Sequence, residues 1–502
     1  MEFLDPKKQK EHLVRLIIGY ILVGAALILT TIILLYQAQG FGYKNGEVIQ
    51  SGLIFVSSRP EGAAVYVNGK LREEKTNARL LMPAGQYTFE LRRDDYRPWK
   101  RAINLEGGAL VRFDYPVLFP TKLTSTTVQR YDVQPPLATQ SLDRRWVLVQ
   151  NPNALASFDM YDTKNPETAA VQTTVPEQLL TIKDGLQRWR LVQWADNNRH
   201  VLLQHTSEKD GKTRSEYILV DRQKPDESVN LTSTLGDQTS QISLVDLNFD
   251  EYYLFNAAEQ TVSTATLDQP TPKPYLENIL GFKSHGDDVM LYATDQGATD
   301  GKVAIKLREN DKTYAIRQVA PSDKYMLDIA RYDGDWYAVA GSPAEARTYV
   351  YKNPAAALEE KSDAPLVPVQ VLKTAGTQYV SFSDNARFIM AQGGQQIATY
   401  DAETDRGYAF QLEAPIDSPQ EHVSWMDAHR MMAVVNGKVQ VFEFDNANDE
   451  TLVAASPAYT PFFDNKYEFM YTLAPQTTKA VNGTEKTQYV LTSTSLRSPA
   501  DQ

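Results

Sequence analysis

An uninterrupted apolar segment near the N-terminus constrains this chain more than any other part of its sequence. Residues 16–36 read LIIGYILVGAALILTTIILLY, a run of 21 residues without a charge. As an α-helix with a rise of about 1.5 Å per residue, the run is about 31 Å long, which matches the hydrocarbon core of a bilayer. No later segment is comparably long and apolar. We therefore predict one transmembrane helix over residues 16–36, with the lipid bilayer as its partner.

The charges beside this segment predict its orientation. Four basic residues precede it, namely Lys7, Lys8, Lys10 and Arg15, whereas only Lys44 follows closely. Because basic flanks stay on the cytoplasmic side, we expect residues 1–15 to form a cytoplasmic tail and everything after residue 36 to lie outside the cytoplasm. A cleaved secretory signal is the alternative, but its apolar region is typically about 7–15 residues long, and Gln37–Gly40 is a poor cleavage site. The sequence therefore favours an uncleaved signal anchor in the cell membrane.

Composition excludes several classes of function. The chain has 502 residues, 42% of them hydrophobic and 23% charged, which is typical of globular protein. Its 51 Lys and Arg against 63 Asp and Glu give a net charge of −12, which argues against nucleic acid as a partner. The absence of cysteine excludes thiolate catalysis, cysteine-ligated zinc and disulfide bonds.

A short polar connector is expected over residues 37–50, and strand patterns begin after it. Apolar residues alternate with polar ones at Ile54 and Val56, and again at Val65 and Val67. The pair Asn68-Gly69 follows, which is the pair best able to adopt the two positive φ values of a type I′ hairpin turn. Residues 51–119 are therefore expected to form a small β domain of five or six strands.

This domain resembles the PEGA family. Residues 60–63 spell PEGA, and the motifs VYVNGK, PAGQY and YRPW follow in order from residues 65, 83 and 96. The resemblance implies a small β module of bacterial and archaeal surface proteins, used as a spacer or adhesion unit, without catalytic residues. The motif residues are expected to be structural, with turns shaped by the glycines and Pro60 and a core packed by Trp99: Pro60, Glu61, Gly62, Ala63, Asn68, Gly69, Pro83, Gly85, Tyr96, Pro98 and Trp99.

Residues 121–502 repeat one pattern. An apolar run, a turn built on Asp, Asn or Gly, a second apolar run, a polar loop and a third run recur, most clearly around Asp196, Asp384 and Asp427. Weaker copies give eight turn segments in total, at residues 142–146, 194–199, 248–252, 284–288, 332–336, 383–387, 426–430 and 463–467. Four short strands with their turns need about 40–45 residues, the size of a propeller blade. We predict a mainly β chain whose C-terminal part is a seven- or eight-bladed β-propeller, with units that resemble WD40-like or TolB-type repeats.

The sequence offers little local support for catalytic chemistry. The histidines are scattered without metal-binding spacing and are expected to be surface or capping residues: His12, His200, His205, His285, His422 and His429. The turn aspartates are expected to cap their own turns through backbone amides: Asp143, Asp196, Asp384, Asp427 and Asp464. Four tryptophans are expected to pack the blades rather than stack on sugars: Trp189, Trp194, Trp336 and Trp425. No catalytic residue, cofactor or metal is predicted.

Two functions fit these observations. The favoured one is a membrane-anchored, extracytoplasmic binding or scaffolding protein of the cell envelope, in which the PEGA-like module presents a propeller that binds protein or glycan. The alternative is a membrane-anchored enzyme that acts on envelope glycans through carboxylates between blades. An enzyme requires two or more acids that converge in a central funnel with perturbed pKa values, whereas a binder requires only a polar or aromatic rim.

Overall fold

The computed structural model describes residues 6–38, 41–44, 47–286, 288–360, 365–417, 422–479 and 485–501. The chain divides into two compact units, Met1–Lys122 and Leu123–Gln502.

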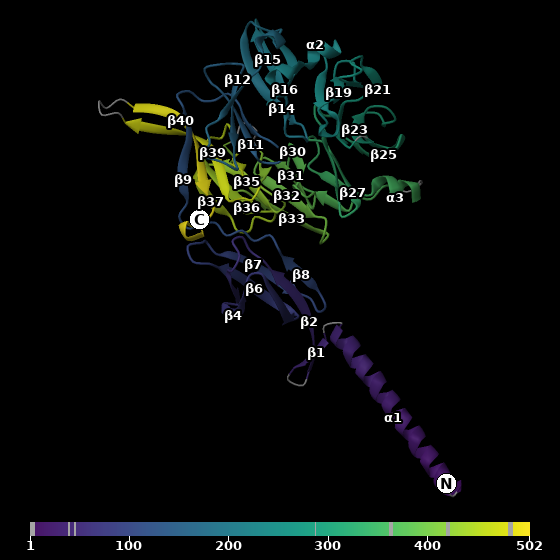
Figure 1. Ribbon diagram of the computed structural model, residues 1–502. Coiled ribbons are helices and arrows are strands. Elements are labelled where there is room, and N and C mark those ends of the chain that lie inside the picture. The colour runs from purple at the N-terminus through teal and green to yellow at the C-terminus, as the bar shows by residue number, and fades with distance from the viewer. Residues whose placement is uncertain are drawn as a thin grey trace, which may run out of the picture. The chain divides into compact units, whose positions relative to one another are not determined.

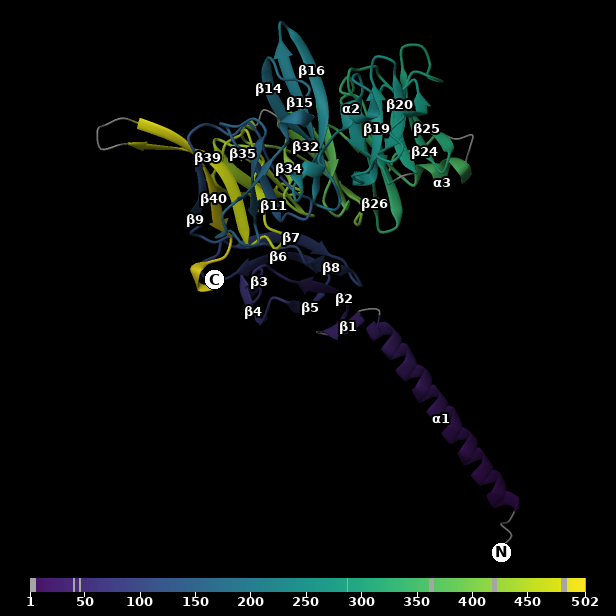
Figure 2. The same ribbon diagram turned by 45° about the horizontal axis from the view of Figure 1, so that its top comes forward.

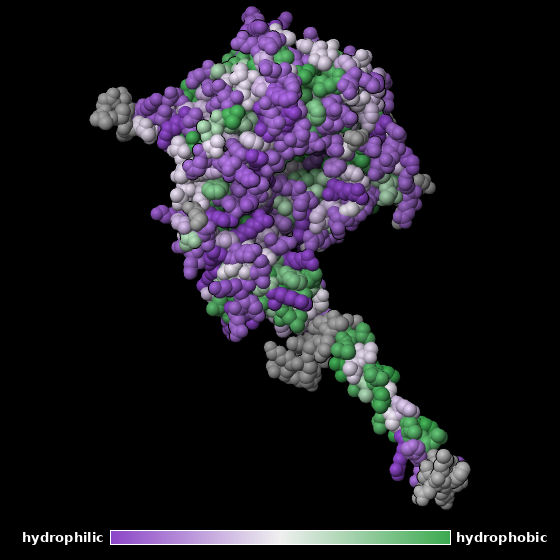
Figure 3. Space-filling model, in the orientation of Figure 1, coloured by the Kyte–Doolittle hydropathy of each residue, from purple (hydrophilic) through white to green (hydrophobic). Residues whose placement is uncertain are grey.

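The first unit begins with one long helix, α1 (Pro6–Ala38). Within it, Lys10–Tyr36 is long and apolar enough to cross a membrane, and none of its most apolar window is buried against the rest of the chain. The exposed side chains form an apolar surface along the helix (Figure 3). The hydroxyls of Thr30 and Thr31 donate to the carbonyls of Ala26 and Leu27 at 2.8 Å, so these two polar groups are satisfied within the helix, as an apolar environment requires.

The remainder of the first unit is a sandwich of two four-stranded sheets (Figure 2). One sheet contains β1 (Phe41–Lys44), β2 (Glu47–Val56), β5 (Ala78–Pro83) and β8 (Leu110–Phe113), with β2 between β5 and the other two. The other runs in the order β4 (Lys70–Lys75), β3 (Ala64–Val67), β6 (Gly85–Arg92) and β7 (Trp99–Leu105). Residues 51–119 thus contain seven strands, β2 to β8, where the sequence predicted five or six. Strand β1 and the first residues of β2 lie in the stretch expected as a connector.

The alternation of apolar residues explains how these sheets pack. Ile54 and Val56 of β2 are fully buried, and so are Phe89 and Leu91 of β6, because each strand turns its apolar face toward the other sheet. The core thus lies between the two sheets, where side-chain burial supplies most of the stability of a small β sandwich.

The second unit is a ring of β sheets. Within the described residues of 123–502, the strands form eight four-stranded sheets, which follow one another around a centre in chain order (Figure 1). From the first strand to the fourth, sheets one to four are β10 (Ala138–Gln140), β11 (Trp146–Gln150), β12 (Ser157–Asp162) and β13 (Val171–Thr174); β14 (Leu186–Trp194), β15 (His200–Lys209), β16 (Lys212–Asp221) and β17 (Val229–Asn230); β18 (Gln241–Leu244), β19 (Glu251–Asn256), β20 (Thr261–Thr266) and β21 (Lys273–Glu277); and β22 (Gly281–His285), β23 (Val289–Thr294), β24 (Val303–Glu309) and β25 (Lys312–Val319).

The chain continues through sheets five to eight. They are β26 (Met326–Tyr332), β27 (Asp335–Gly341), β28 (Thr348–Lys352) and β29 (Gln370–Leu372); β30 (Tyr379–Phe382), β31 (Phe388–Gly393), β32 (Gln396–Asp401) and β33 (Arg406–Gln411); β34 (Ser424–Trp425), β35 (Arg430–Val435), β36 (Lys438–Glu443) and β37 (Glu450–Ala454); and β38 (Phe462–Phe463), β39 (Phe469–Lys479), β40 (Glu485–Ser495) and β9 (Thr124–Tyr131). Short helices lie in the connections: α2 (Leu231–Leu235), α3 (Pro354–Glu360), η1 (Glu177–Leu179), η2 (Pro225–Glu227) and η3 (Val245–Leu247). One more, η4 (Pro499–Asp501), follows the last strand.

This topology is that of an eight-bladed β-propeller, and it confirms the fold predicted from the repeats. Each of the eight turn segments joins the first strand of a sheet to its second strand. Asp287, in the fourth of these segments, lies outside the described residues. Consecutive sheets bury apolar clusters between them, as where Phe158 of the first sheet meets Trp189 of the second with 5.8 Å between ring centroids. Because every sheet covers its neighbour, no blade has to bury its faces alone.

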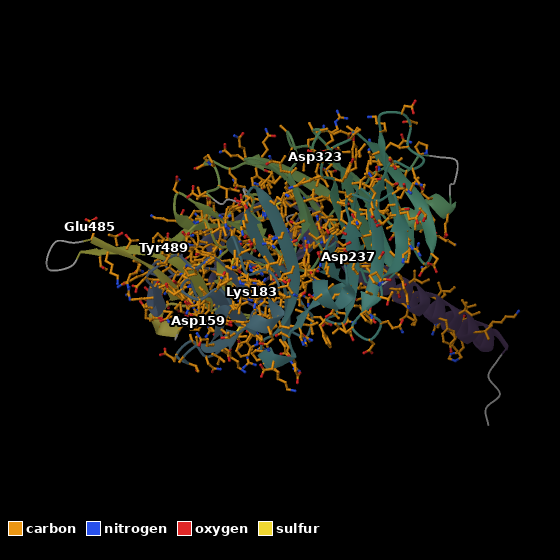
Figure 4. All side chains as sticks on the ribbon, turned by 90° about the horizontal axis from the view of Figure 1, so that it is seen from above. Asp159, Lys183, Asp237, Asp323, Glu485 and Tyr489 are labelled. Carbon is orange, nitrogen blue, oxygen red and sulfur yellow. The ribbon has the colours of Figure 1, made fainter. Side chains whose placement is uncertain are left out.

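The ring is closed by a strand from its own beginning. Strand β9 pairs with β40 as the outermost strand of the eighth sheet, although more than 350 residues separate them along the chain. Tyr131, at the end of β9, extends this closure to the first sheet, since its hydroxyl lies 2.7 Å from that of Tyr161 and donates to Asp159 at 3.1 Å. The hairpin of β39 and β40 continues outward past the end of β9, and Glu485 is seen near the tip of this projecting arm (Figure 4).

Candidate binding site in the centre of the propeller

The first strands of the eight sheets line two neighbouring cavities. One cavity has a volume of about 980 Å³ and is lined by residues of β10, β14, β34 and β38, with Arg144 and Asp384 from two turns. The other, of about 890 Å³, is lined by residues of β14, β18, β22, β26 and β30. We call them the first and the second cavity. Arg190 of β14 lines both, so the two spaces adjoin at this side chain.

Arg144 dominates the first cavity. It stands in the turn between β10 and β11 with a φ of 61°, and its side chain reaches three other sheets. Its guanidinium is ion-paired with Asp384 of the sixth sheet and donates to the carbonyl of Met426 of the seventh at 2.8 Å. It also lies over the ring of Tyr467 of the eighth, 4.7 Å from the centroid. One side chain of the first sheet therefore ties together the turns of the last three.

Two carboxylates meet in this cluster, and each has an arginine. Asp427 pairs with Arg430 at 2.5 Å. Burial favours a higher pKa for Asp427, but the charge of Arg430 and hydrogen bonds from backbone amides outweigh it and hold this pKa below its usual value. Partial burial raises the pKa of Asp384, and the charge of Arg144 opposes that rise. The two acids thus form part of a neutralised structural network, and this arrangement favours a binding surface over an acid–base pair.

The second cavity combines polar and aromatic side chains. Lys283 of β22 lies 3.6 Å from Asp328 of β26. Burial raises the pKa of Asp328 above its usual value, although the charge of Lys283 opposes this rise. Amide and hydroxyl groups line the same wall, together with aromatic rings: Gln193, Gln204, Gln241, Ser243, Ser284, Ser381, Phe255, Phe282 and Tyr379. Amides and hydroxyls both donate and accept hydrogen bonds, and rings offer flat apolar faces. This lining can therefore hold a peptide segment or a sugar chain.

The structure divides the turn aspartates into two groups. Asp427 accepts from the backbone amides of His429 and Arg430 at 2.8 and 2.9 Å, and Asp143 and Asp464 cap their turns in the same way, as predicted. Asp196 and Asp384 do not, so the prediction is wrong for them. In their turns the next residue is the cap, because Asn197 accepts from the amide of Arg199 at 2.9 Å, and Asn385 from that of Arg387 at 3.2 Å. Asp384 is thereby left to pair with Arg144.

The histidines also differ from expectation at one position. His205, predicted as a surface or capping residue, lies in the middle of β15 and is fully buried. Its Nδ1 is 2.8 Å from Glu216 Oε1 and its Nε2 is 3.0 Å from Gln187 Oε1. Among the described residues, no three His, Cys, Asp or Glu side chains gather in a way that could hold a metal ion. His205 therefore belongs to a buried polar network rather than to the central cavities.

The four tryptophans pack the blades, as predicted. Trp189 and Trp194 are buried between the first two sheets. Trp425 packs, partly buried, against the apolar cluster of the sixth and seventh sheets, and it also lines the first cavity, where its Nε1 donates to the hydroxyl of Ser381 at 3.0 Å. Trp336 stands edge-on to His285, with ring centroids 5.1 Å apart.

The PEGA motif residues lie in the first unit, at turns and in its core. Asn68 and Gly69 have φ values of 49° and 74° between β3 and β4, which confirms the predicted hairpin. Asn68 also accepts from the amide of Thr88 at 2.8 Å. Gly62 has a φ of 79° and donates to the carbonyl of Thr76 at 2.9 Å, while Glu61 beside it is exposed.

The other motif residues support the same sandwich. The amide of Ala63 donates to the Thr76 hydroxyl at 2.9 Å, and the carbonyl of Pro60 accepts from Ser58 at 2.6 Å. Pro83 and Gly85 flank the turn from β5 to β6, and the hydroxyl of Tyr87 donates to the Pro83 carbonyl at 2.9 Å. Trp99 is buried with its ring 5.4 Å from Phe113, Tyr96 is buried nearby in the chain, and Pro98 between them is exposed.

Known proteins are similar to this chain in two respects. A search of curated proteins found no match to the chain. Among solved structures, Hsv2 from Kluyveromyces lactis is similar at 11% identity, covering 66% of this chain and all of that one, with a TM-score of 0.40. The β-propeller domain of Cps50 (Swd1) from Myceliophteria thermophila is similar at 10% identity, covering 66% of this chain and all of that one, with a TM-score of 0.36. Residues 51–117 match the family model of the PEGA domain, so this chain joins a PEGA domain to a β-propeller.

Proposed function

We propose that this protein is a membrane-anchored binding or scaffolding protein of the cell envelope. In this proposal residues 1–15 are a cytoplasmic tail, residues 16–36 cross the membrane, and the PEGA domain (51–119) and the propeller (121–502) lie outside the cytoplasm. The observation that carries the binding role is the pair of adjoining cavities lined by the first strands of all eight sheets. A segment of a protein or glycan partner would lie there, against the amide, hydroxyl and aromatic side chains of the second cavity.

The charged groups of the two cavities support binding rather than hydrolysis. Asp384 and Asp427 are paired with Arg144 and Arg430, and Asp328 with Lys283. A hydrolase of glycans needs one carboxylate free as a proton donor and another free as a base or nucleophile. The ion pairs instead fix these acids in place, and at Asp427 the pairing also holds the pKa below its usual value.

The membrane topology can be tested with single cysteines, because the chain has none of its own. Thr213→Cys places a thiol at an exposed position of β16, and Lys10→Cys places one before the apolar segment. We expect a membrane-impermeant maleimide to label the Thr213→Cys protein in intact cells and the Lys10→Cys protein only after permeabilisation. Labelling in the opposite order would contradict the orientation, and loss of the first 36 residues from the mature protein would contradict the anchor.

The location of the binding site can be tested by photo-crosslinking in cells. A p-benzoylphenylalanine placed at Gln241, which is exposed and lines the second cavity, is expected to give crosslinked products several times more abundant than the same group at Lys273. Lys273 is a matched control, since it is also exposed but lies on the fourth strand of the same sheet. Equal products at both positions, or products at Lys273 alone, would show that partners bind outside the cavities.

A further inference from the structure

One face of the PEGA domain is apolar, exposed and bordered by arginines. In β2, Ile54 and Val56 point into the core, so Leu53 and Phe55 point to the opposite face of the sheet. The strand register places Leu81 of β5 and Leu110 of β8 directly beside Leu53, on either side of it. The same register places Arg79 and Arg112 on either side of Phe55. We call these six residues the leucine–arginine face.

This face has unusual chemistry for a surface exposed to water. The side chains of Leu81 and Leu110 are 71% and 53% exposed. The guanidinium groups of Arg79 and Arg112 lie 5.9 and 5.7 Å from the centroid of the Phe55 ring, so two cations flank one aromatic ring. Contiguous exposed apolar groups with polar groups at their edge are typical of a surface that binds another protein, a ligand or a membrane. An apolar centre with cations at its edge fits a layer that offers both hydrocarbon and phosphate.

The strand register also keeps this face close to the end of the apolar helix. Helix α1 ends at Ala38, and Phe41 pairs with Gln50 across the hairpin of β1 and β2. Three residues of chain span at most about 11 Å, and paired Cα atoms are about 5 Å apart. Leu53 follows three residues after Gln50, so it lies within about 26 Å of the helix end. A helix that crosses the bilayer therefore holds this face within reach of the lipid headgroups.

The distribution of charge favours the same neighbour. Residues 51–119 carry 11 Lys and Arg against 8 Asp and Glu, whereas residues 120–502 carry 35 against 51. The domain next to the membrane is thus basic in an otherwise acidic protein. Basic residues near a bilayer are attracted to its anionic phosphates, and this attraction acts only over a short distance from the surface.

We propose that the leucine–arginine face rests on the outer surface of the lipid bilayer. Leu53, Leu81 and Leu110 enter the interfacial layer, and Arg79 and Arg112 bind lipid phosphates beside it. This inference rests on the proposed membrane anchoring, because the helix is what brings the face to the surface. The PEGA domain would then be an orienting element that fixes the chain against the membrane plane, and not only a spacer.

The absence of native cysteine allows a direct test in the full-length protein. Leu81→Cys, carrying an environment-sensitive fluorophore, is reconstituted into vesicles of phosphatidylcholine and phosphatidylglycerol that contain lipids with a nitroxide in the headgroup region. Leu71→Cys is the matched control, since Leu71 is 62% exposed in the same domain but lies on β4 of the other sheet. Leu27→Cys, in the middle of α1, reports insertion of the helix through a nitroxide deep in the acyl chain.

We expect the headgroup nitroxide to quench the label at position 81 at least threefold more than at position 71, and Leu110→Cys to behave like Leu81→Cys. Replacing Arg79 and Arg112 with glutamine is expected to reduce quenching at position 81, whereas Arg72→Gln on β4 is expected to leave it unchanged.

Equal, weak quenching at positions 81 and 71 with strong quenching at position 27 would overturn the proposal while leaving the anchor intact. Weak quenching at position 27 would overturn the anchor itself. A label at position 81 that is shielded from iodide but not quenched by lipid would show that protein, not lipid, covers the face.

Discussion

A disulfide between positions 125 and 494 is expected to stabilise the propeller by about 3 kcal/mol more than an equivalent disulfide between positions 477 and 487. The first bond would be made by Ser125→Cys with Thr494→Cys, which joins β9 to β40 across the closure of the ring. The hydroxyls of the native residues are 2.8 Å apart, so the two side chains already face each other. The second bond would be made by Thr477→Cys with Thr487→Cys, whose hydroxyls are 2.9 Å apart in the hairpin of β39 and β40.

The expected difference in stabilisation between the two disulfides arises in the unfolded chain. The closure bond joins residues 369 apart and the hairpin bond joins residues 10 apart. Because the entropy that a crosslink removes grows with the logarithm of loop length, the larger loop gains about 3 kcal/mol over the smaller one. The measurement is the shift in denaturation midpoint between oxidised and reduced protein for each pair. Equal shifts would contradict the prediction. They would show that β9 does not separate from β40 in the unfolding step that determines the stability of the ring.

Removal of one buried charge is expected to have an effect of similar size. Glu216 of β16 is 1% exposed and accepts five hydrogen bonds from four residues. The donors are His205, the amide and hydroxyl of Thr181, the amide of Ile182 and the side chain of Asn230, at 2.6 to 3.3 Å. Glu216→Gln would leave several of these buried donors without a charged acceptor, which typically costs about 3–5 kcal/mol. Hydrogen exchange at the amides of Thr181 and Ile182, which donate to Glu216 directly, should accelerate most.

The destabilisation caused by Glu216→Gln is expected to depend on pH. Burial favours a higher pKa for Glu216, but the hydrogen bonds from His205, Thr181 and Asn230 outweigh it and lower this pKa to about 2. A carboxylate with a lowered pKa in the folded state stabilises the protein at pH values above its ordinary pKa and stops doing so as it is protonated. The stability advantage of the native protein over Glu216→Gln should therefore be full above about pH 4.5 and decline as the pH falls toward 2. Glu208→Gln, an exposed position on β15, is the control and should show no such dependence.

The parts of the fold that the sequence predicts are those set by local patterns. An uncharged apolar run has few alternatives to a helix, and Asn68-Gly69 can reach the two positive φ values that its turn requires. The eight copies of the turn segment predicted the propeller because each copy joins the same two strands of its sheet. The choice between seven and eight blades depended on weak copies such as residues 284–288, which are less similar to the clear copies around Asp196, Asp384 and Asp427.

What the sequence could not predict depends on contacts between distant residues. Arg144 resembles any exposed turn arginine, and its partners Met426 and Asp384 lie more than 200 residues away along the chain. Their proximity follows only from closure of the ring. The burial of His205 was missed for a related reason, since its partner Gln187 lies on the preceding strand and its environment is set by Trp189 and the adjacent sheet. The alternation of β15 did contain a signal, because His205 stands at the spacing of the buried Val201 and Leu203.

The position of β9 has a consequence for synthesis of the protein. Strand β9 leaves the ribosome some 350 residues before its partner β40, and at about 5–20 residues per second it waits roughly 20–70 s for that partner. During this time both of its edges are open to pairing with other chains, which is a risk for any apolar strand. The sequence of β9, TSTTVQRY, has a single aliphatic residue and an arginine, so the segment that waits longest is poorly suited to aggregate. A chain that ends before β40 would never cover this strand, and incomplete translation products should therefore be recognisable by an exposed β9.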